Sequence, residues 1–142
     1  MTRASDLMTE DPVTVTPATR IKEAARLLYS LDIRHLPVVD DDGTLVGMLS
    51  DRDLRGLTVP HLLAGDTVSD LLQQSLDASV STLMTGDVLS VEIEDDVADV
   101  VELMLEHKIG AVPVVDGDGG LVGIVSYMDV LRSLPLDEDR AN

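Results

Sequence analysis

Two series of apolar residues recur along the chain with the three- to four-residue spacing that is typical of one buried helix face. The apolar positions are Ile21, Ala24, Ala25, Leu28 and Leu31 in the first series and Val97, Val100, Val101 and Met104 in the second. Each series predicts an amphipathic helix. We expect Thr19 and Asp95 to act as N-caps, because short polar side chains there accept backbone hydrogen bonds.

Short apolar runs on either side of each predicted helix indicate β-strands. The runs that precede the helices cover residues 13–15 and 89–91, and those that follow cover residues 36–39 and 112–115. A turn rich in aspartate and glycine then leads into a third strand, at residues 45–49 and 121–125. A second helix is expected after Ser50 and after Ser126. The order of elements in each half is therefore β-α-β-β-α.

The two halves of the chain repeat one another at a constant offset of 76 residues. The tripeptide Leu7-Met8-Thr9 recurs as Leu83-Met84-Thr85, and Pro37-Val38-Val39-Asp40 recurs as Pro113-Val114-Val115-Asp116. Residues 7–55 and 83–131 share 18 identities in 49 aligned positions, without a gap. A register kept over this length indicates internal duplication.

The duplication predicts an α/β (α+β) fold made of two similar units. Repeat one covers residues 5–57, residues 58–82 form a linker with a short helix, repeat two covers residues 83–134, and residues 135–142 form a polar tail. A sheet of two or three short strands leaves one of its faces uncovered. We therefore expect the two units to pack against each other with pseudo-two-fold symmetry.

The formal net charge is −17, and it is unevenly spread. Residues 1–55 contain seven basic and ten acidic side chains, whereas residues 56–142 contain three basic and seventeen acidic ones. Such a surface repels nucleic acids and anionic lipids, so neither is expected as a partner. The N-terminus lacks an apolar signal core, and no apolar run reaches the roughly 20 residues of a membrane span. We expect a soluble, cytoplasmic protein.

Motifs of known catalytic and metal sites are absent from the sequence. The chain lacks cysteine, Gly-x-Ser-x-Gly, a Gly-Lys-Ser/Thr loop and His-Glu-x-x-His, and no two histidines have the spacing of metal ligands. The acidic run at residues 40–42 resembles the start of a calcium loop but lacks the later ligands and the closing glutamate. We expect neither an enzyme nor a resident metal ion.

A Ser-x-x-Asp sequence follows the third predicted strand of each repeat, with Ser50 and Asp53 in the first and Ser126 and Asp129 in the second. Two interpretations are open. Serine and aspartate at this spacing can form a capping box that only completes the following helix. Alternatively, the exposed N–H groups and the serine can bind an anion, while the aspartate accepts the two hydroxyls of a ribose.

Doubled, in order and in register, these motifs resemble a pair of CBS (cystathionine β-synthase) domains, together called a Bateman module. The resemblance covers residues 5–134 and implies units that pack through their sheets. It also implies binding of an adenosine-containing ligand such as AMP, ADP, ATP or S-adenosylmethionine, with no required cofactor. We expect no further domain, and the chain is similar to stand-alone CBS pairs, which often form homodimers and regulate another protein.

The resemblance implies two nucleotide sites, each shared between the repeats. The preferred site combines Thr19, Ala24, Arg34, His35, Ser126 and Asp129. The second site combines Asp95, Val100, Gly110, Ala111, Ser50, Arg52 and Asp53. The preferred site offers a hydroxyl and two potentially cationic side chains for phosphate, whereas Asp95 could repel phosphate at the second. Gly110 and Ala111 leave room there for a base, and Arg52 or Lys108 could supply positive charge.

Two other functions are open on the sequence alone. The chain could be a ligand-free adaptor or dimerisation module, which Asp95 and the bulky Arg34-His35 pair favour. It could also be a divalent-cation (Mg²⁺) sensor, because its second half is strongly acidic. Mg²⁺ could in addition accompany a bound nucleotide.

Overall fold

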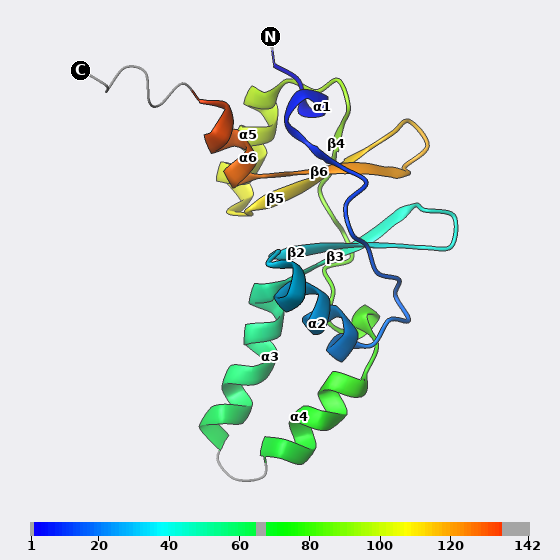
Figure 1. The fold of residues 1–142 in the computed structure, drawn as a ribbon, viewed down its shortest axis with the longest axis vertical. Coiled ribbons are helices and arrows are strands. Elements are labelled where there is room, and N and C mark those ends of the chain that lie inside the picture. Colours follow the sequence, from blue (N-terminus) through cyan, green and yellow to red (C-terminus); the bar gives the residue numbers. More distant parts are fainter. Residues whose placement is uncertain (1, 65–67, 135–142) are drawn as a thin grey trace, which may run out of the picture. The chain divides into compact units, whose positions relative to one another are not determined.

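A computed structural model describes residues 2–64 and 68–134 of the chain (Figure 1). The fold is of the mixed α/β class that the sequence predicts, and the predicted tail at residues 135–142 lies outside the described residues. The elements in chain order are α1 (Ala4–Leu7), β1 (Thr9–Glu10), α2 (Ile21–Leu31), β2 (His35–Val39), β3 (Leu45–Ser50), α3 (Asp51–Ala64), α4 (Val68–Asp77), the 3₁₀ turn η1 (Val80–Thr82), β4 (Val91–Glu92), α5 (Val97–His107), β5 (Ala111–Val115), β6 (Leu121–Ser126) and α6 (Tyr127–Ser133).

The chain folds into two compact units. The first-repeat unit contains residues 13–88. The second-repeat unit combines the residues up to Pro12 with those from Leu89 onwards. The N-terminal segment therefore folds with the second repeat rather than with the repeat that follows it in the sequence.

The second-repeat unit is built on a four-stranded sheet with the strand order β1-β6-β5-β4. β5 and β6 form an antiparallel hairpin in which Ala111 lies opposite Ser126. β1 extends the sheet antiparallel to β6, with Thr9 opposite Ile124, and β4 adds a parallel edge beside β5. The hairpin therefore brings Ala111 to the start of the second Ser-x-x-Asp sequence.

The first-repeat unit has the same arrangement in a reduced form. β2 and β3 form the equivalent antiparallel hairpin, with His35 opposite Ser50. Single bridges replace the two outer strands, and they join Met48 with Thr85 and Val15 with Val38. The pairs His35–Ser50 and Val15–Val38 lie 76 residues before Ala111–Ser126 and Val91–Val114. The pair Met48–Thr85 corresponds to Ile124–Thr9, because each unit takes this edge segment from the part of the chain that precedes the other repeat. The duplication in the sequence is therefore also a duplication of strand register.

The first strand of each repeat is shorter than the sequence pattern predicts. Residues 13–15 contribute only the bridge at Val15, and residues 89–91 contribute only Val91, the first residue of β4. Val15 and Val91 are each 4% exposed, whereas the residues two positions earlier are 43% and 39% exposed. One buried apolar side chain in each run is too few to hold a longer strand against the sheet.

α2 and α5 confirm the two predicted amphipathic helices. Their buried side chains are Ile21, Ala24 and Leu28 in α2 and Val100 and Met104 in α5. Leu31 was expected on the buried face but is 47% exposed, because it is the last residue of α2. Asp32 and Lys108 follow the two helices in the left-handed conformation, at φ 54° and 55°, and turn the chain towards the next strand.

The predicted N-caps of these helices are wrong by one residue. The cap positions are Arg20 and Asp96, where the backbone is extended, and only Asp96 accepts a capping bond, from the N–H of Ala98 at 3.0 Å. Thr19 Oγ1 and Asp95 Oδ2 instead accept the backbone N–H groups of the residues three positions earlier, at 3.0 and 2.8 Å. These two side chains therefore close the turn before each helix.

The segment that precedes each repeat packs into the core of the other repeat. Ala4 donates its backbone N–H to the carbonyl of Asp95 at 2.8 Å, and Val80 donates to the carbonyl of Thr19 at 2.7 Å. Ala4 and Val80 both have 0% exposure. In the second-repeat unit this exchange continues into β1, which lies beside β6 (Figure 1).

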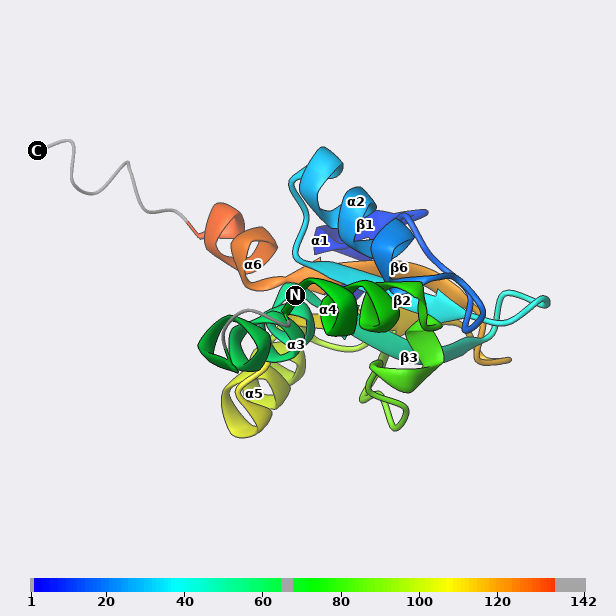
Figure 2. The same cartoon turned by 90° about the horizontal axis from the view of Figure 1, so that it is seen from below.

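α3 and α4 lie side by side in the first-repeat unit (Figure 2). At the end of α4, Asp77 accepts a hydrogen bond from Lys22 of α2 at 2.9 Å, and this bond is the main reason that the pKa of the Asp77 carboxyl is lowered. None of the helices in the described parts of the chain combines the length and the apolar character that a membrane span requires.

Candidate functional site

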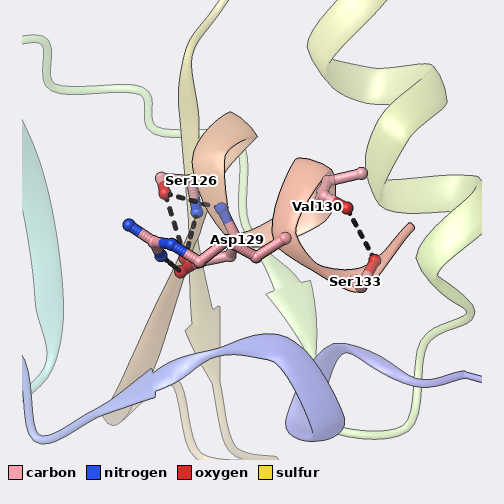
Figure 3. A network of polar contacts seen from close by, with 5 residues as sticks. Ser126, Asp129, Val130 and Ser133 are labelled. Atoms are coloured by element: carbon pink, nitrogen blue, oxygen red, sulfur yellow. Dashed lines mark hydrogen bonds and ion pairs between the residues drawn. The ribbon is translucent and has the colours of Figure 1, made fainter. Parts of the chain in front are cut away.

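The same pair of side chains closes the junction between the third strand and the second helix of each repeat. In the first-repeat unit, the backbone N–H of Ser50 donates to Asp53 Oδ2 at 2.8 Å, and the N–H of Asp53 donates to Ser50 Oγ at 3.3 Å. In the second-repeat unit, Ser126 and Asp129 make the same two bonds, at 2.8 and 3.3 Å (Figure 3). These reciprocal bonds are capping boxes, so the first interpretation of the motif is confirmed. A carboxylate has two oxygens, and the box needs only one of them.

Asp129 has two donors beyond the capping box. The hydroxyl of Ser126 also donates to Oδ2, at 3.0 Å (Figure 3), and Nη1 of Arg132 donates to Oδ1 at 3.1 Å. The Asp129 side chain is 12% exposed and the Arg132 side chain 68%. The sequence interpretation missed Arg132, although its spacing of three residues from Asp129 on a helix could have indicated it.

The strand register brings the residues before the first Pro-Val-Val sequence to the capping box of the same repeat. His35 lies opposite Ser50, and the carbonyl of Arg34 accepts the N–H of Asp51 at 2.9 Å. The Arg34 side chain is exposed and that of His35 is half-buried. Two basic side chains therefore border this capping box.

The equivalent positions of the second repeat carry small residues on the same backbone frame. Ala111 lies opposite Ser126, and the carbonyl of Gly110 accepts the N–H of Tyr127 at 3.0 Å. The two units thus present equivalent backbones with different chemistry, basic and bulky in the first unit and small in the second. The two repeats therefore differ in the side chains beside the capping box and not in the backbone that carries them.

His35 is surrounded by charged groups of both signs. Burial lowers the pKa of its imidazole below the ordinary 6.5, the carboxylates of Asp51 and Asp53 oppose this effect, and Arg34 and Arg52 reinforce it. The imidazole is therefore mainly neutral at pH 7. Arg34 is consequently the more dependable of the two basic groups for holding a phosphate at neutral pH.

Two of the predicted site residues pack into hydrophobic cores. Ala24 and Val100 have 0% exposure and belong to the buried clusters of their units. Thr19 and Asp95 are half-buried, and their side-chain oxygens are engaged in the turns before α2 and α5. The side chains of Ala24 and Val100 therefore stabilise the fold, whereas Thr19 and Asp95 keep partial access to solvent.

Asp95 lies in an acidic depression of the second-repeat unit. This depression has a volume of about 510 Å³ and is lined by Arg3, Ser5 and residues 92–95 and 115–117. Four of these residues are Asp or Glu, and Arg3 is already paired with Glu94 at 2.8 Å. The negative lining disfavours a phosphate group there.

Among the side chains that the structure describes, at residues 2–57 and 73–134, no three His, Asp or Glu groups gather closely enough to hold a metal ion. Each of the two predicted nucleotide sites combines residues from both units, and the structure describes each unit by itself. Thr19, Ala24, Arg34, His35, Ser50, Arg52 and Asp53 belong to the first-repeat unit, and Asp95, Val100, Gly110, Ala111, Ser126 and Asp129 belong to the second. The combination of these residues into two sites stays a prediction.

Each unit follows one plan, in which a short strand or a single bridge is followed by a helix, a hairpin and a second helix, with a capping box at the same junction. This plan defines a duplicated α/β module. The chain belongs to the CBS-domain family, because the family description "CBS domain" matches residues 4–60 and 80–136. The resemblance found in the sequence motifs is thereby confirmed.

Relatives and solved structures of this family resemble the chain over most of its length. It is 35% identical to the chloroplastic CBS domain-containing protein CBSX1 of Arabidopsis thaliana over a 140-residue alignment, which covers 87% of this chain and 59% of that relative. A crystal structure of CBSX2 in complex with AMP aligns with a TM-score of 0.79 at 35% identity, covering 94% of this chain and 96% of that one. The CBS domain pair of MJ0100 in complex with 5′-methylthioadenosine and S-adenosyl-L-methionine aligns with a TM-score of 0.74 at 30% identity, covering 93% and 94%.

Proposed function

We propose that this chain is a regulatory module that binds an adenine nucleotide or a related adenosyl ligand with residues of both repeats and thereby modulates a partner protein. The similar CBSX2 binds AMP, and the MJ0100 pair binds two adenosyl compounds, which supports this ligand class. The observation in this chain that carries the proposal is the half-buried carboxylate that Ser50 and Ser126 hold at the same place in each repeat.

A ribose presents two adjacent hydroxyls, and a fixed carboxylate can accept hydrogen bonds from both. The backbone N–H of the serine binds Oδ2 of Asp53 and of Asp129, so Oδ1 is the oxygen that we assign to a ribose hydroxyl. Because the capping box fixes the carboxylate before a ligand arrives, little side-chain entropy is lost on binding. The cap and the ribose interpretations are therefore compatible.

The phosphate end of the ligand distinguishes the two proposed sites. We assign Thr19, Ala24, Arg34, His35, Ser126 and Asp129 to the preferred site, where Arg34 supplies a permanent positive charge. The second proposed site contains Asp95, whose acidic surroundings disfavour phosphate, together with Val100, Gly110, Ala111, Ser50, Arg52 and Asp53. A phosphorylated ligand is therefore expected at the preferred site first, and Mg²⁺ is expected only as the companion of a di- or triphosphate.

We assign the module a regulatory role without catalysis of its own. A ligand that binds one arrangement of the repeats better than another shifts the population towards that arrangement. If a partner protein recognises the same arrangement, the ligand and the partner change each other's affinity by the same factor.

Calorimetry and thermal unfolding with AMP, ADP, ATP, S-adenosylmethionine and cyclic dinucleotides, each with and without Mg²⁺, test the proposal. A ligand that binds only the folded state raises the unfolding temperature, and at 100 times its Kd it adds about 2.7 kcal/mol of stability. The double variant Asp53→Asn/Asp129→Asn, which keeps an oxygen acceptor for each serine, should abolish the response. If none of the ligands binds the unaltered protein, the proposal is wrong.

A second candidate function is that of a dimerisation module. Tyr29 on α2 and Leu105 on α5 occupy equivalent positions and are 90% and 74% exposed, so each repeat presents a large apolar side chain to solvent at the same place on its helix. Analytical ultracentrifugation of the unaltered protein and of Tyr29→Glu would test whether Tyr29 joins two copies. A homodimer that Tyr29→Glu dissociates, in a protein that binds none of the nucleotides, would favour this candidate over the first.

A further inference from the structure

The carboxylates of Asp53 and Asp129 occupy equivalent places but have different neighbours. Both accept the backbone N–H of a serine on Oδ2, at 2.8 Å. At Asp129, Oδ1 also accepts a hydrogen bond from the guanidinium of Arg132 at 3.1 Å. Arg132 lies three residues after Asp129 on α6, a spacing that places the two side chains on one face of the helix. Both carboxylate oxygens of Asp129 therefore already have donors.

The described part of the first repeat shows no counterpart of this ion pair. Gly56 occupies the position 76 residues before Arg132, and it carries no side chain that could reach Asp53. A Cβ at Gly56 would meet nothing within 4 Å, so the space beside α3 at this point is open. The duplication thus supplies two equivalent carboxylates. Asp129 accepts a hydrogen bond from an arginine three residues later, and Asp53 has a glycine at that position.

We propose that Arg132 competes with the ribose hydroxyls for Asp129 and so sets the ligand affinity of the preferred site. This inference rests on the proposed function. A ribose that donates a hydrogen bond to Oδ1 of Asp129 must first displace the guanidinium. Arg132 is 68% exposed and can move into water, whereas Asp129 is 12% exposed and is held by the capping box. The arginine is therefore the member of the pair that moves.

The expected size of the competition follows from the exposure of the pair. An ion pair with one largely exposed member stabilises a protein weakly, which corresponds to about a two- to fivefold change in an equilibrium constant. Removing the Arg132 guanidinium should therefore strengthen ribose binding at Asp129 by about this factor. The effect should depend on the 2′-hydroxyl, because a ligand without it makes less use of the carboxylate.

The first arm of the test uses calorimetry with adenosine, which has the ribose but no phosphate. In an Asp53→Asn background, Asp129 is the remaining charged carboxylate, and Arg132→Gln is then added. Adenosine affinity should rise about two- to fivefold, while the affinity for 2′-deoxyadenosine, which keeps only the 3′-hydroxyl, should rise less. The matched control is Arg26→Gln, which removes the same charge from another pair at a spacing of three residues, with Glu23 at 3.0 Å on α2.

The second arm transfers the ion pair to the first repeat. In an Asp129→Asn background, Gly56→Arg places a cation three residues after Asp53 and should weaken adenosine binding, whereas Gly56→Gln should not. If the unaltered protein binds adenosine but Arg132→Gln leaves its affinity unchanged or lower, the competition is refuted and the proposed function stands. Equal gains for adenosine and 2′-deoxyadenosine also refute it. If no variant binds adenosine or AMP, both the inference and the proposed function are wrong.

Discussion

Met8 lies directly over Gly123, with its Sδ 2.5 Å from the position that a Cβ at residue 123 would occupy. Met84 holds the equivalent place over Gly47, also at 2.5 Å. A second tripeptide, Leu-Val-Gly, also recurs at the same offset, at residues 45–47 and 121–123. Its glycine and the methionine of Leu-Met-Thr are therefore the two sides of one contact, made once in each unit. The bare glycine backbone lets the methionine segment approach and pair at the edge of the hairpin.

Gly123→Ala should destabilise the protein because the new methyl group would collide with Met8. The carbonyl oxygen of Thr9, at 3.0 Å from the same point, closes the other side. Overpacking of this kind typically costs about 1 to 3 kcal/mol. Urea unfolding measures the loss.

The matched control for this prediction is Gly56→Ala in α3, where nothing lies within 4 Å of the added Cβ. Alanine is the better helix former, so this variant should gain about 0.5 to 1 kcal/mol. In a Met8→Ala background the cost of Gly123→Ala should shrink, because the colliding sulfur is gone. An equal cost in both backgrounds would show that the contact with Met8 is not the cause.

Periodicity and duplication were sufficient to predict most of the elements. The apolar spacing located α2 and α5, and the Pro-Val-Val sequences located β2 and β5. The exchange of N-terminal segments was missed, because the pattern of residues 2–10 does not say which sheet they join. That choice depends on contacts distant in sequence, such as the burial of Ala4 beside Asp95 and of Met8 on Gly123.

The candidate site could be predicted only in part. The spacing of Ser126 and Asp129 correctly indicated a capping box. The helix start was displaced by one residue because Thr19 and Asp95 bond backward to the turn rather than forward into the helix. The spacing of Arg132 from Asp129 permits their ion pair, but it does not select Arg132 among the several partners that a carboxylate can have.

Ala4→Asp should unfold the second-repeat unit in preference to the first. Ala4 has 0% exposure in the core that contains Val100 and Val125, so the substitution buries a charge without a partner. Such a charge costs on the order of 3 to 5 kcal/mol. Hydrogen exchange followed by mass spectrometry should show lost protection in β6 while the β2–β3 hairpin keeps its own.

Thr2→Asp is the control for this experiment, because it adds the same charge at an exposed position two residues earlier. It should leave the exchange of both hairpins unchanged. If Ala4→Asp instead lowers the exchange protection of β2 and β3 first, the assignment of the N-terminal segment to the second-repeat unit is wrong.

Acidification should weaken the fold through His35. Its pKa is lowered in the folded protein, mainly by burial, so the unfolded chain binds a proton more readily than the folded one. The neutral imidazole thus contributes stability that is fully present above the ordinary pKa of 6.5 and is lost as the pH falls from there towards the folded-state pKa. Thermal unfolding between about pH 5.5 and 7.5, where most carboxylates stay ionised, measures this slope.

The slope should be reduced in His35→Gln and kept in His107→Gln, which alters an exposed histidine of α5. The charged groups that act on His35 are Asp51, Asp53, Arg34 and Arg52. All four groups are retained in both variants, so the difference between the variants reports the imidazole itself. Identical slopes in His35→Gln and the unaltered protein would contradict the prediction.

Asp129→Ala should weaken the binding of a phosphorylated adenosyl ligand more than Asp53→Ala does. The reason lies at the phosphate end, because the proposed site of Asp129 includes Arg34, whereas that of Asp53 includes Asp95. Both substitutions also remove a capping box, at a cost of about 0.5 to 2 kcal/mol of stability, so binding has to be compared at a temperature where both variants are folded. Asp129→Asn separates the two roles, since its amide oxygen can still accept the N–H of Ser126 while the charge is lost. Calorimetry should therefore show weak AMP binding by Asp129→Asn, although its unfolding temperature stays near that of the unaltered protein. If Asp129→Ala binds AMP more strongly than Asp53→Ala does, the assignment of the preferred site is reversed.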